Sequence, residues 1–186
     1  MKIKKTKIKD LLIIQPKIHY DKRGYFFESY HKKRYNKILK DNNFVQDNHS
    51  FSKKNVLKGI HFQHKNPQSQ LLYLVVGKLY YCFVDLRPKS KTFLKNVTFI
   101  LDSKNHTQIY QPPGVGLGCY VLSDFTHLTY KVSKLYDIKN EMSLAWNDDT
   151  LNLKWPCKKP ILSDNDKYNF KLKDLDLHKF KDLMKL

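Results

Sequence analysis

The sequence has few cysteines, and it lacks the long hydrophobic runs of a membrane protein. Its three cysteines, Cys82, Cys119 and Cys157, are widely spaced and odd in number, so no pair has metal-ligand spacing and no disulfide framework is indicated. No apolar run approaches the roughly 20 residues of a membrane span. The apolar residues 11–14 are too few for the core of a signal peptide. We therefore expect a reduced, cytoplasmic protein without a membrane partner.

Arginine is also scarce, although the chain is strongly basic. The formal net charge is +18, but only three of the 35 cationic residues are arginine, and the lysines are scattered over the whole length. Surfaces that bind DNA or RNA usually contain arginine, because its planar side chain makes two hydrogen bonds to a base edge. The composition therefore argues against a nucleic-acid partner. An anionic small substrate, such as a nucleotide diphosphate, fits the positive charge equally well.

The pattern of apolar residues predicts a single domain made mostly of strands. No repeat, low-complexity tract or Pro/Gly-rich linker divides the 186 residues, which suffice for one substantial core. Strands are expected at residues 11–18, 24–30, 71–85 (with a turn at Gly77-Lys78), 97–101, 106–110, 119–122 and 127–132. Helices are expected at residues 32–40 and, as a loose amphipathic pattern, at 168–186. Many short strands with turns between them predict a sandwich or barrel.

Three segments of this pattern carry conspicuous polar side chains, at residues 21–29, 46–50 and 56–63. Taken singly, they are explained more simply as a turn entering an aromatic strand, as a polar loop or the end of a strand, and as a strand with a core histidine. The third segment, however, places His61 in an alternating apolar stretch, and Asp166 offers a carboxylate about a hundred residues later. A histidine held by an aspartate is the arrangement needed for a base that removes a carbon-bound proton.

In order and spacing, these segments resemble the nucleotide-sugar 3,5-epimerases typified by dTDP-4-dehydrorhamnose 3,5-epimerase. They match as Asp-x-Arg-Gly-x-Phe-x-Glu, then Val-Gln-Asp-Asn-His-Ser, then Val-Leu-Lys-Gly-Ile-His-Phe-Gln. Later segments match as well, at residues 84–87, 130–131, 146–148, 155–156 and 162–166. The resemblance extends from residue 5 to residue 167, which is nearly the whole chain.

The resemblance implies an all-β fold, a cupin-type jelly roll of antiparallel strands. One domain would cover residues 1–186, with residues 168–186 as a peripheral tail. It also implies a homodimer that uses no metal and no other cofactor. The residues support the absence of a metal independently. Metal-binding cupins have a His-x-His pair, whereas here Gln63 stands two residues after His61 and the next histidine is His64.

The implied activity is that of an isomerase acting beside a ketone in the synthesis of surface polysaccharides such as lipopolysaccharide or capsule. A proton leaves C3 and/or C5 of a dTDP- or GDP-linked 4-keto-6-deoxy sugar, and another arrives from the opposite face. By resemblance, His61 is the base, Asp166 the carboxylate that orients it, and Tyr130 the acid. The residues that match the substrate-binding positions of the family are Arg23, Glu28, Gln46, Asn48, Lys58, Gln70, Tyr136 and Glu141.

Three positions depart from the family pattern. Lys58 replaces an arginine, which turns a bidentate phosphate contact into a point charge. Gln70 replaces a lysine that polarises the substrate, and Leu117 replaces a second pocket histidine. Removing a preorganised donor at an oxyanion costs about 2.7–4 kcal/mol. Three functions therefore stay open: an epimerase with a non-standard sugar (a GDP-linked heptose included) or a one-carbon outcome, a catalytically impaired homologue that binds nucleotide sugars, and a 3,4-ketoisomerase.

Overall fold

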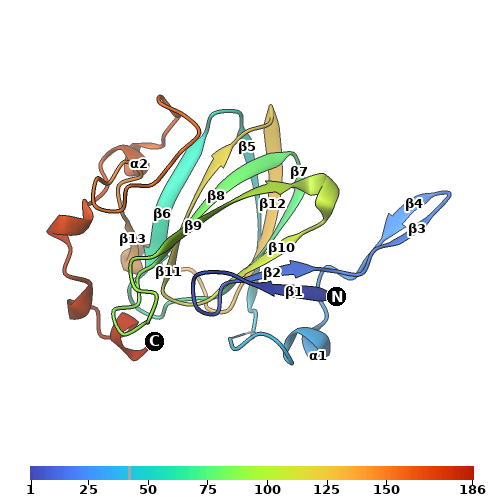
Figure 1. Cartoon of the computed structure of the whole chain (residues 1–186), viewed down its shortest axis with the longest axis horizontal. Coiled ribbons are helices and arrows are strands. Elements are labelled where there is room, and N and C mark those ends of the chain that lie inside the picture. The colour runs from blue at the N-terminus through green and yellow to red at the C-terminus, as the bar shows by residue number, and fades with distance from the viewer. Residues whose placement is uncertain (42) are drawn as a thin grey trace.

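The computed structural model describes residues 1–41 and 43–186, and two antiparallel β-sheets that face each other form its body (Figure 1). The first sheet has the order β1 (Lys2–Lys5), β2 (Leu12–Gln15), β10 (Gln108–Gln111), β7 (Gln70–Val76), β12 (Phe125–Val132) and β5 (Gln46–Lys53). The second has the order β13 (Glu141–Ser143), β6 (Leu57–Gln63), β11 (Val115–Val121), β8 (Lys78–Asp85) and β9 (Asn96–Asp102). The predicted all-β jelly roll is confirmed.

The remaining elements are short. A two-stranded hairpin of β3 (His19–Asp21) and β4 (Gly24–Phe26) projects from the body near the N-terminus (Figure 1). The helical elements are α1 (Lys32–Tyr35), α2 (Asp164–Lys167), η1 (Ser103–Asn105), η2 (Ile138–Asn140), η3 (Leu172–Asp174), η4 (Leu177–Lys179) and η5 (Leu183–Lys185). None of the described helices is long and apolar enough to span a membrane.

The five-stranded sheet is buried on both faces, as strand β8 shows. Successive side chains of a strand point to opposite faces. Leu79, Tyr81 and Phe83 belong to the core between the two sheets. Cys82 and Val84 point to the opposite face of the sheet and belong to a second buried cluster. Because both faces are covered, β8 reads as an almost continuous apolar run rather than as an alternating one.

The C-terminal segment covers the outer face of that sheet. Leu172, Leu177 and Leu183 are buried in the same cluster as Cys82 and Val84. The loose amphipathic helix predicted at residues 168–186 is realised only as the single 3₁₀ turns η3, η4 and η5. These leucines are five and six residues apart, and this spacing does not keep them on one face of an α-helix. The segment therefore packs as an irregular strap.

Truncating Leu183 tests how firmly this strap is held. Its side chain is fully buried, so we expect Leu183→Ala to lower the free energy of unfolding by about 2–5 kcal/mol through lost burial and a residual cavity. Urea unfolding followed by circular dichroism measures the change. Leu135→Ala is the matched control, since Leu135 is 70% exposed. Equal unfolding midpoints for the two variants would show that the strap contributes nothing to stability.

The predicted helix at residues 32–40 is wrong in its length, because α1 ends at Tyr35. Its first turn carries no acidic residue and its N-cap, His31, makes no capping hydrogen bond. The positive end of the helix dipole is therefore uncompensated. The chain continues as a turn that brings Leu39 beside Tyr35 in a small buried cluster. Tertiary packing, rather than helix propensity, holds this region.

Candidate active site

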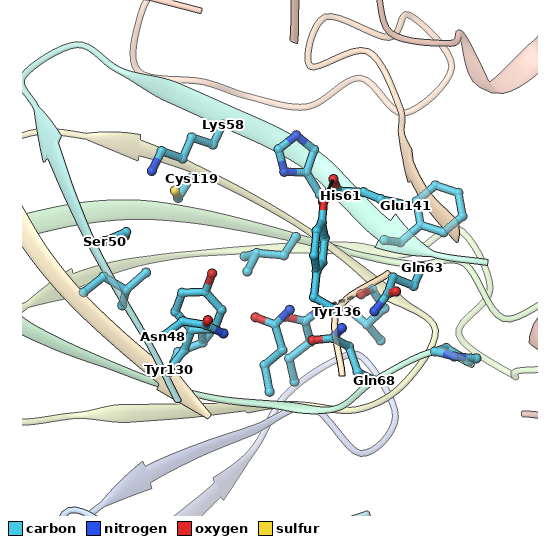
Figure 2. A pocket seen from close by; sticks show the side chains of 18 of the residues that line it. Asn48, Ser50, Lys58, His61, Gln63, Gln68, Cys119, Tyr130, Tyr136 and Glu141 are labelled. Carbon is cyan, nitrogen blue, oxygen red and sulfur yellow. Dashed lines mark hydrogen bonds between the residues drawn. The ribbon is translucent and has the colours of Figure 1, made fainter. Parts of the chain in front are cut away.

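A cavity of about 390 Å³ lies between the two sheets and is lined from both of them. Figure 2 shows polar side chains of both sheets directed into it. The predicted site residues that line it are Gln46, Asn48, Lys58, His61, Gln70, Tyr130, Tyr136 and Glu141. The cavity therefore brings together eight side chains that are spread over almost a hundred positions of the sequence.

A β-bulge at Gly59 turns two of these side chains to the same side. Strand β6 advances three residues from Lys58 to His61 while β11 advances two, from Cys119 to Leu117. The extra residue allows Lys58 and His61, which an unbroken alternation would direct to opposite faces, both to line the cavity. Gly59 has φ of +94°, and a Cβ there would lie 2.3 Å from the carbonyl oxygen of Leu117. Only glycine fits this position.

His61 and Asp166 are joined by a hydrogen bond of 2.7 Å between Nε2 and Oδ1. Asp166 lies in α2, and its side chain is only 2% exposed. The same Oδ1 accepts the Gly59 N–H at 3.1 Å, and Oδ2 accepts the Ser163 hydroxyl at 2.8 Å. The carboxylate thus accepts three hydrogen bonds, and it fixes the imidazole ring through Nε2. Among the described residues, the other ring nitrogen, Nδ1, has no hydrogen-bond partner, and His61 lines the cavity (Figure 2).

These donors keep Asp166 ionised. Burial by itself raises the pKa of this carboxyl, but the contacts from His61, Ser163 and the Gly59 N–H outweigh burial and hold the pKa below its ordinary value of 3.8. A carboxyl whose pKa is lower in the folded state stabilises the fold above the unfolded pKa, and that stabilisation disappears as pH falls through the folded pKa. At neutral pH the negative charge beside His61 is therefore permanent.

Tyr130 enters the cavity from the opposite sheet, where β12 pairs it with Asn48 of β5. Burial raises the pKa of its phenol, and the nearby Glu141 and Cys119 raise it further. The hydroxyl is accordingly protonated at neutral pH and can donate. The imidazole of His61 from one sheet and a protonated phenol from the other therefore line the same cavity.

Hydrogen bonds order the rim of the cavity. Gln46 donates from Nε2 to Oδ1 of Asn48 at 2.8 Å, and the Tyr136 hydroxyl donates to Glu141 at 2.6 Å. That carboxylate raises the pKa of Tyr136 to about 12. Lys58, from β6, supplies a cation that lines the same cavity (Figure 2). The site thus combines ordered amide and phenol groups with a positive charge.

Two predicted substrate-binding residues lie outside the cavity of this chain. Arg23 is at the tip of the β3–β4 hairpin, where it binds Asp21 and its side chain is 84% exposed. Glu28 forms an ion pair with Arg34 beside α1. Arg23 thus lies in the hairpin that projects from the body (Figure 1), and Glu28 lies two residues after the end of β4.

Sequence reasoning missed several polar lining residues, namely Ser50, Gln63, Gln68, Tyr81 and Gln111. The only sequence signal for such residues is the side of the strand to which each one points. In β8, Tyr81 points to the same side as the apolar Leu79 and Phe83, so the pattern predicts a core residue there. Cys119 also lines the cavity, and burial raises the pKa of its thiol to about 11.

Comparison with known proteins decides the family. The model of the dTDP-4-dehydrorhamnose 3,5-epimerase family matches residues 5–174. This chain belongs to that family. The dTDP-4-dehydrorhamnose 3,5-epimerase of Salmonella typhimurium is 41% identical over 87% of this chain and 90% of its own length. The predicted family and the predicted isomerase class are confirmed.

Solved structures of epimerases agree with the fold. The dTDP-6-deoxy-D-glucose-3,5-epimerase of Legionella pneumophila, in complex with dTDP-4-keto-L-rhamnose, superposes with a TM-score of 0.90 at 38% identity over 95% of each chain. A 3'-monoepimerase of Streptomyces bikiniensis, in complex with dTDP-quinovose, gives a TM-score of 0.85 at 27% identity, covering 90% of this chain and 86% of that one. The epimerase fold is thus shared by proteins whose names record different epimerisation outcomes.

Proposed function

We propose that this protein epimerises a dTDP-linked 4-keto-6-deoxy sugar at C3, C5 or both, and so supplies an activated sugar for surface polysaccharides. The observation that carries the proposal is the 2.7 Å hydrogen bond between His61 and the buried Asp166, in a cavity that Tyr130 enters from the opposite sheet. The free thiols of Cys82, Cys119 and Cys157 support a reducing, cytoplasmic location.

The geometry supports proton transfer through the sugar. The ketone at C4 acidifies the hydrogens at C3 and C5, and Nδ1 of His61 takes one of them while Nε2–H donates to Asp166. The electron pair of the broken C–H bond moves toward the ketone oxygen and forms an enolate. Tyr130 returns a proton to the carbon from the other face, which inverts the centre. Asp166 stabilises the imidazolium that His61 becomes.

The rim of the cavity suits the nucleotide diphosphate. Lys58 offers a positive charge to a phosphate as a point contact. Gln46, Asn48 and the Tyr136–Glu141 pair offer amide, phenol and carboxylate groups for the ribose and base. The dTDP donors in the names of the relatives favour dTDP over GDP for this chain.

Proton NMR in D₂O tests the proposal. The protein is incubated with dTDP-4-keto-6-deoxyglucose and, separately, with GDP-linked 4-keto hexose and heptose. We expect deuterium to enter C3, C5 or both positions of the dTDP sugar. Movement of the keto group to C3 would indicate a 3,4-ketoisomerase instead. Binding without any exchange would indicate a catalytically impaired homologue, a function that the neutral Gln70 and the apolar Leu117 favour.

We also propose that the protein is a homodimer. The projecting hairpin carries three aromatic residues that are each more than half exposed, Tyr20, Tyr25 and Phe26. At the edge of the six-stranded sheet, the rings of Phe51 and Phe125 contact each other and are also exposed. Apolar surface of this kind is covered in assemblies. Association would also give Arg23 and Glu28 a substrate-binding role in the cavity of the second copy. A monomer mass in sedimentation equilibrium would contradict this proposal.

A further inference from the structure

Unpaired polar atoms gather in the wall of the cavity. Of the five buried side-chain atoms that have no hydrogen-bond partner among the described residues, three belong to cavity-lining residues: Tyr81 Oη, Gln63 Nε2 and Gln111 Oε1. Leaving a buried polar group unpaired is unfavourable, so most such groups in folded proteins have a partner. Their gathering at one cavity indicates that its ligand provides the partners.

Tyr81 is the most informative of the three. Its side chain is fully buried, yet its hydroxyl has no partner among the described residues. Two other buried tyrosines behave differently. Tyr35 donates to the side chain of Gln108 at 2.6 Å, and Tyr110 donates to the carbonyl oxygen of Asp41 at 3.1 Å. These two tyrosines find acceptors within the protein, whereas the hydroxyl of Tyr81, a residue that lines the cavity, has no partner among the described residues.

Tyr81 lies in the same sheet as the base. It faces Cys119 of β11 in the strand register, and β11 is also the strand that pairs with β6, which carries His61. Burial, with the nearby Cys119 and Tyr130, raises the pKa of the Tyr81 phenol well above its ordinary value. The phenol is therefore a hydrogen-bond donor throughout the neutral range.

The proposed reaction needs such a donor. Charge develops on the ketone oxygen as the enolate forms, and a preorganised hydrogen bond to that oxygen is a large part of catalysis of this kind. Leu117, which pairs with His61 in the register, has no polar atom, and Gln70 has no charge. Tyr81 lines the same cavity, and its hydroxyl makes no hydrogen bond to any residue that the structure describes.

We propose that Tyr81 is a further catalytic residue, whose hydroxyl donates a hydrogen bond to the ketone oxygen of the bound 4-keto sugar and holds the enolate. The proposal rests on the proposed function. Tyr81 keeps its proton throughout, while His61 receives the proton from carbon and Tyr130 delivers one to carbon. Because the bond strengthens as negative charge develops, it stabilises the transition state more than the ground state.

The test replaces Tyr81 with phenylalanine, which removes only the hydroxyl. We expect the kcat for C3 and C5 exchange to fall about 100-fold, with the Kd for dTDP and the thermal midpoint essentially unchanged. Tyr80→Phe is the matched control, because Tyr80 is the neighbouring residue, its hydroxyl donates to the carbonyl oxygen of Lys154, and it does not line the cavity. A folded Tyr81→Phe protein with wild-type kcat would overturn the proposal.

A binding experiment separates this proposal from the proposed function. Affinities for dTDP and for dTDP-4-keto-6-deoxyglucose are measured by calorimetry in a His61→Ala background, so that no turnover interferes. Adding Tyr81→Phe should weaken binding of the keto sugar several-fold and leave dTDP binding unchanged. Equal losses for both ligands, or no loss, would overturn the contact. Absence of exchange in the wild-type protein would instead overturn the epimerase function, while the affinities would still test the contact.

Discussion

His61→Ala should abolish the exchange of sugar protons with solvent, with a loss of at least about 1,000-fold in rate. Among the described residues that line the cavity, His61 is the one whose side chain combines a carboxylate partner, at 2.7 Å, with a second ring nitrogen. Alanine removes the base without adding a competing group. Exchange at C3 and C5 followed by NMR in D₂O measures the loss.

The matched control is His64→Ala, three residues further along the chain. The His64 ring packs against Phe180 and does not line the cavity. This variant should therefore keep the wild-type exchange rate, and both variants should still bind dTDP. Full exchange in the His61→Ala protein would exclude His61 as the base.

Asp166→Asn should reduce the exchange rate by about 1,000- to 10,000-fold, the order of the effect seen when the orienting carboxylate of a catalytic triad becomes an amide. Asparagine keeps the size of the side chain but lacks the charge that stabilises the imidazolium. Asp166 accepts hydrogen bonds from His61, Gly59 and Ser163. The NH₂ group of asparagine cannot accept a hydrogen bond, so it would face one of these donors and break that bond. The fall should appear in kcat, with little change in the Kd for dTDP.

Asp164→Asn is the control for this substitution, because Asp164 lies in the same short helix α2 with its side chain 90% exposed. It should leave the exchange rate unchanged.

The free energy of unfolding provides a second test of the charge on Asp166. The lowered pKa of Asp166 predicts that the wild-type protein is more stable than Asp166→Asn at pH 7 and that this difference shrinks as pH falls below about 3.8. A pH-independent difference would contradict a role for the charge.

Strand β5 shows where pattern reading reaches its limit. By their own pattern, residues 46–50 predict a polar loop or the end of a strand, yet they begin an eight-residue strand, Gln46–Lys53. Gln46, Asn48 and Ser50 alternate correctly, but the inner face they share lines a cavity and not an apolar core. Hydrophobic periodicity detects strands whose inner face is buried against apolar groups, so it does not detect this one.

The sequence by itself determined the family and the all-β architecture, because ordered motifs run along the chain. The same motifs indicate His61, Asp166 and Tyr130 as the candidates for the base, its carboxylate and the acid. Only the tertiary structure decided that the Gly59 bulge turns Lys58 and His61 to one side, and that the Tyr81 hydroxyl has no partner in the part of the chain that the structure describes. The physical reason is that local patterns record whether a side chain prefers to be buried. Which groups meet across two sheets, and which buried polar atoms find partners, depends on long-range register and packing.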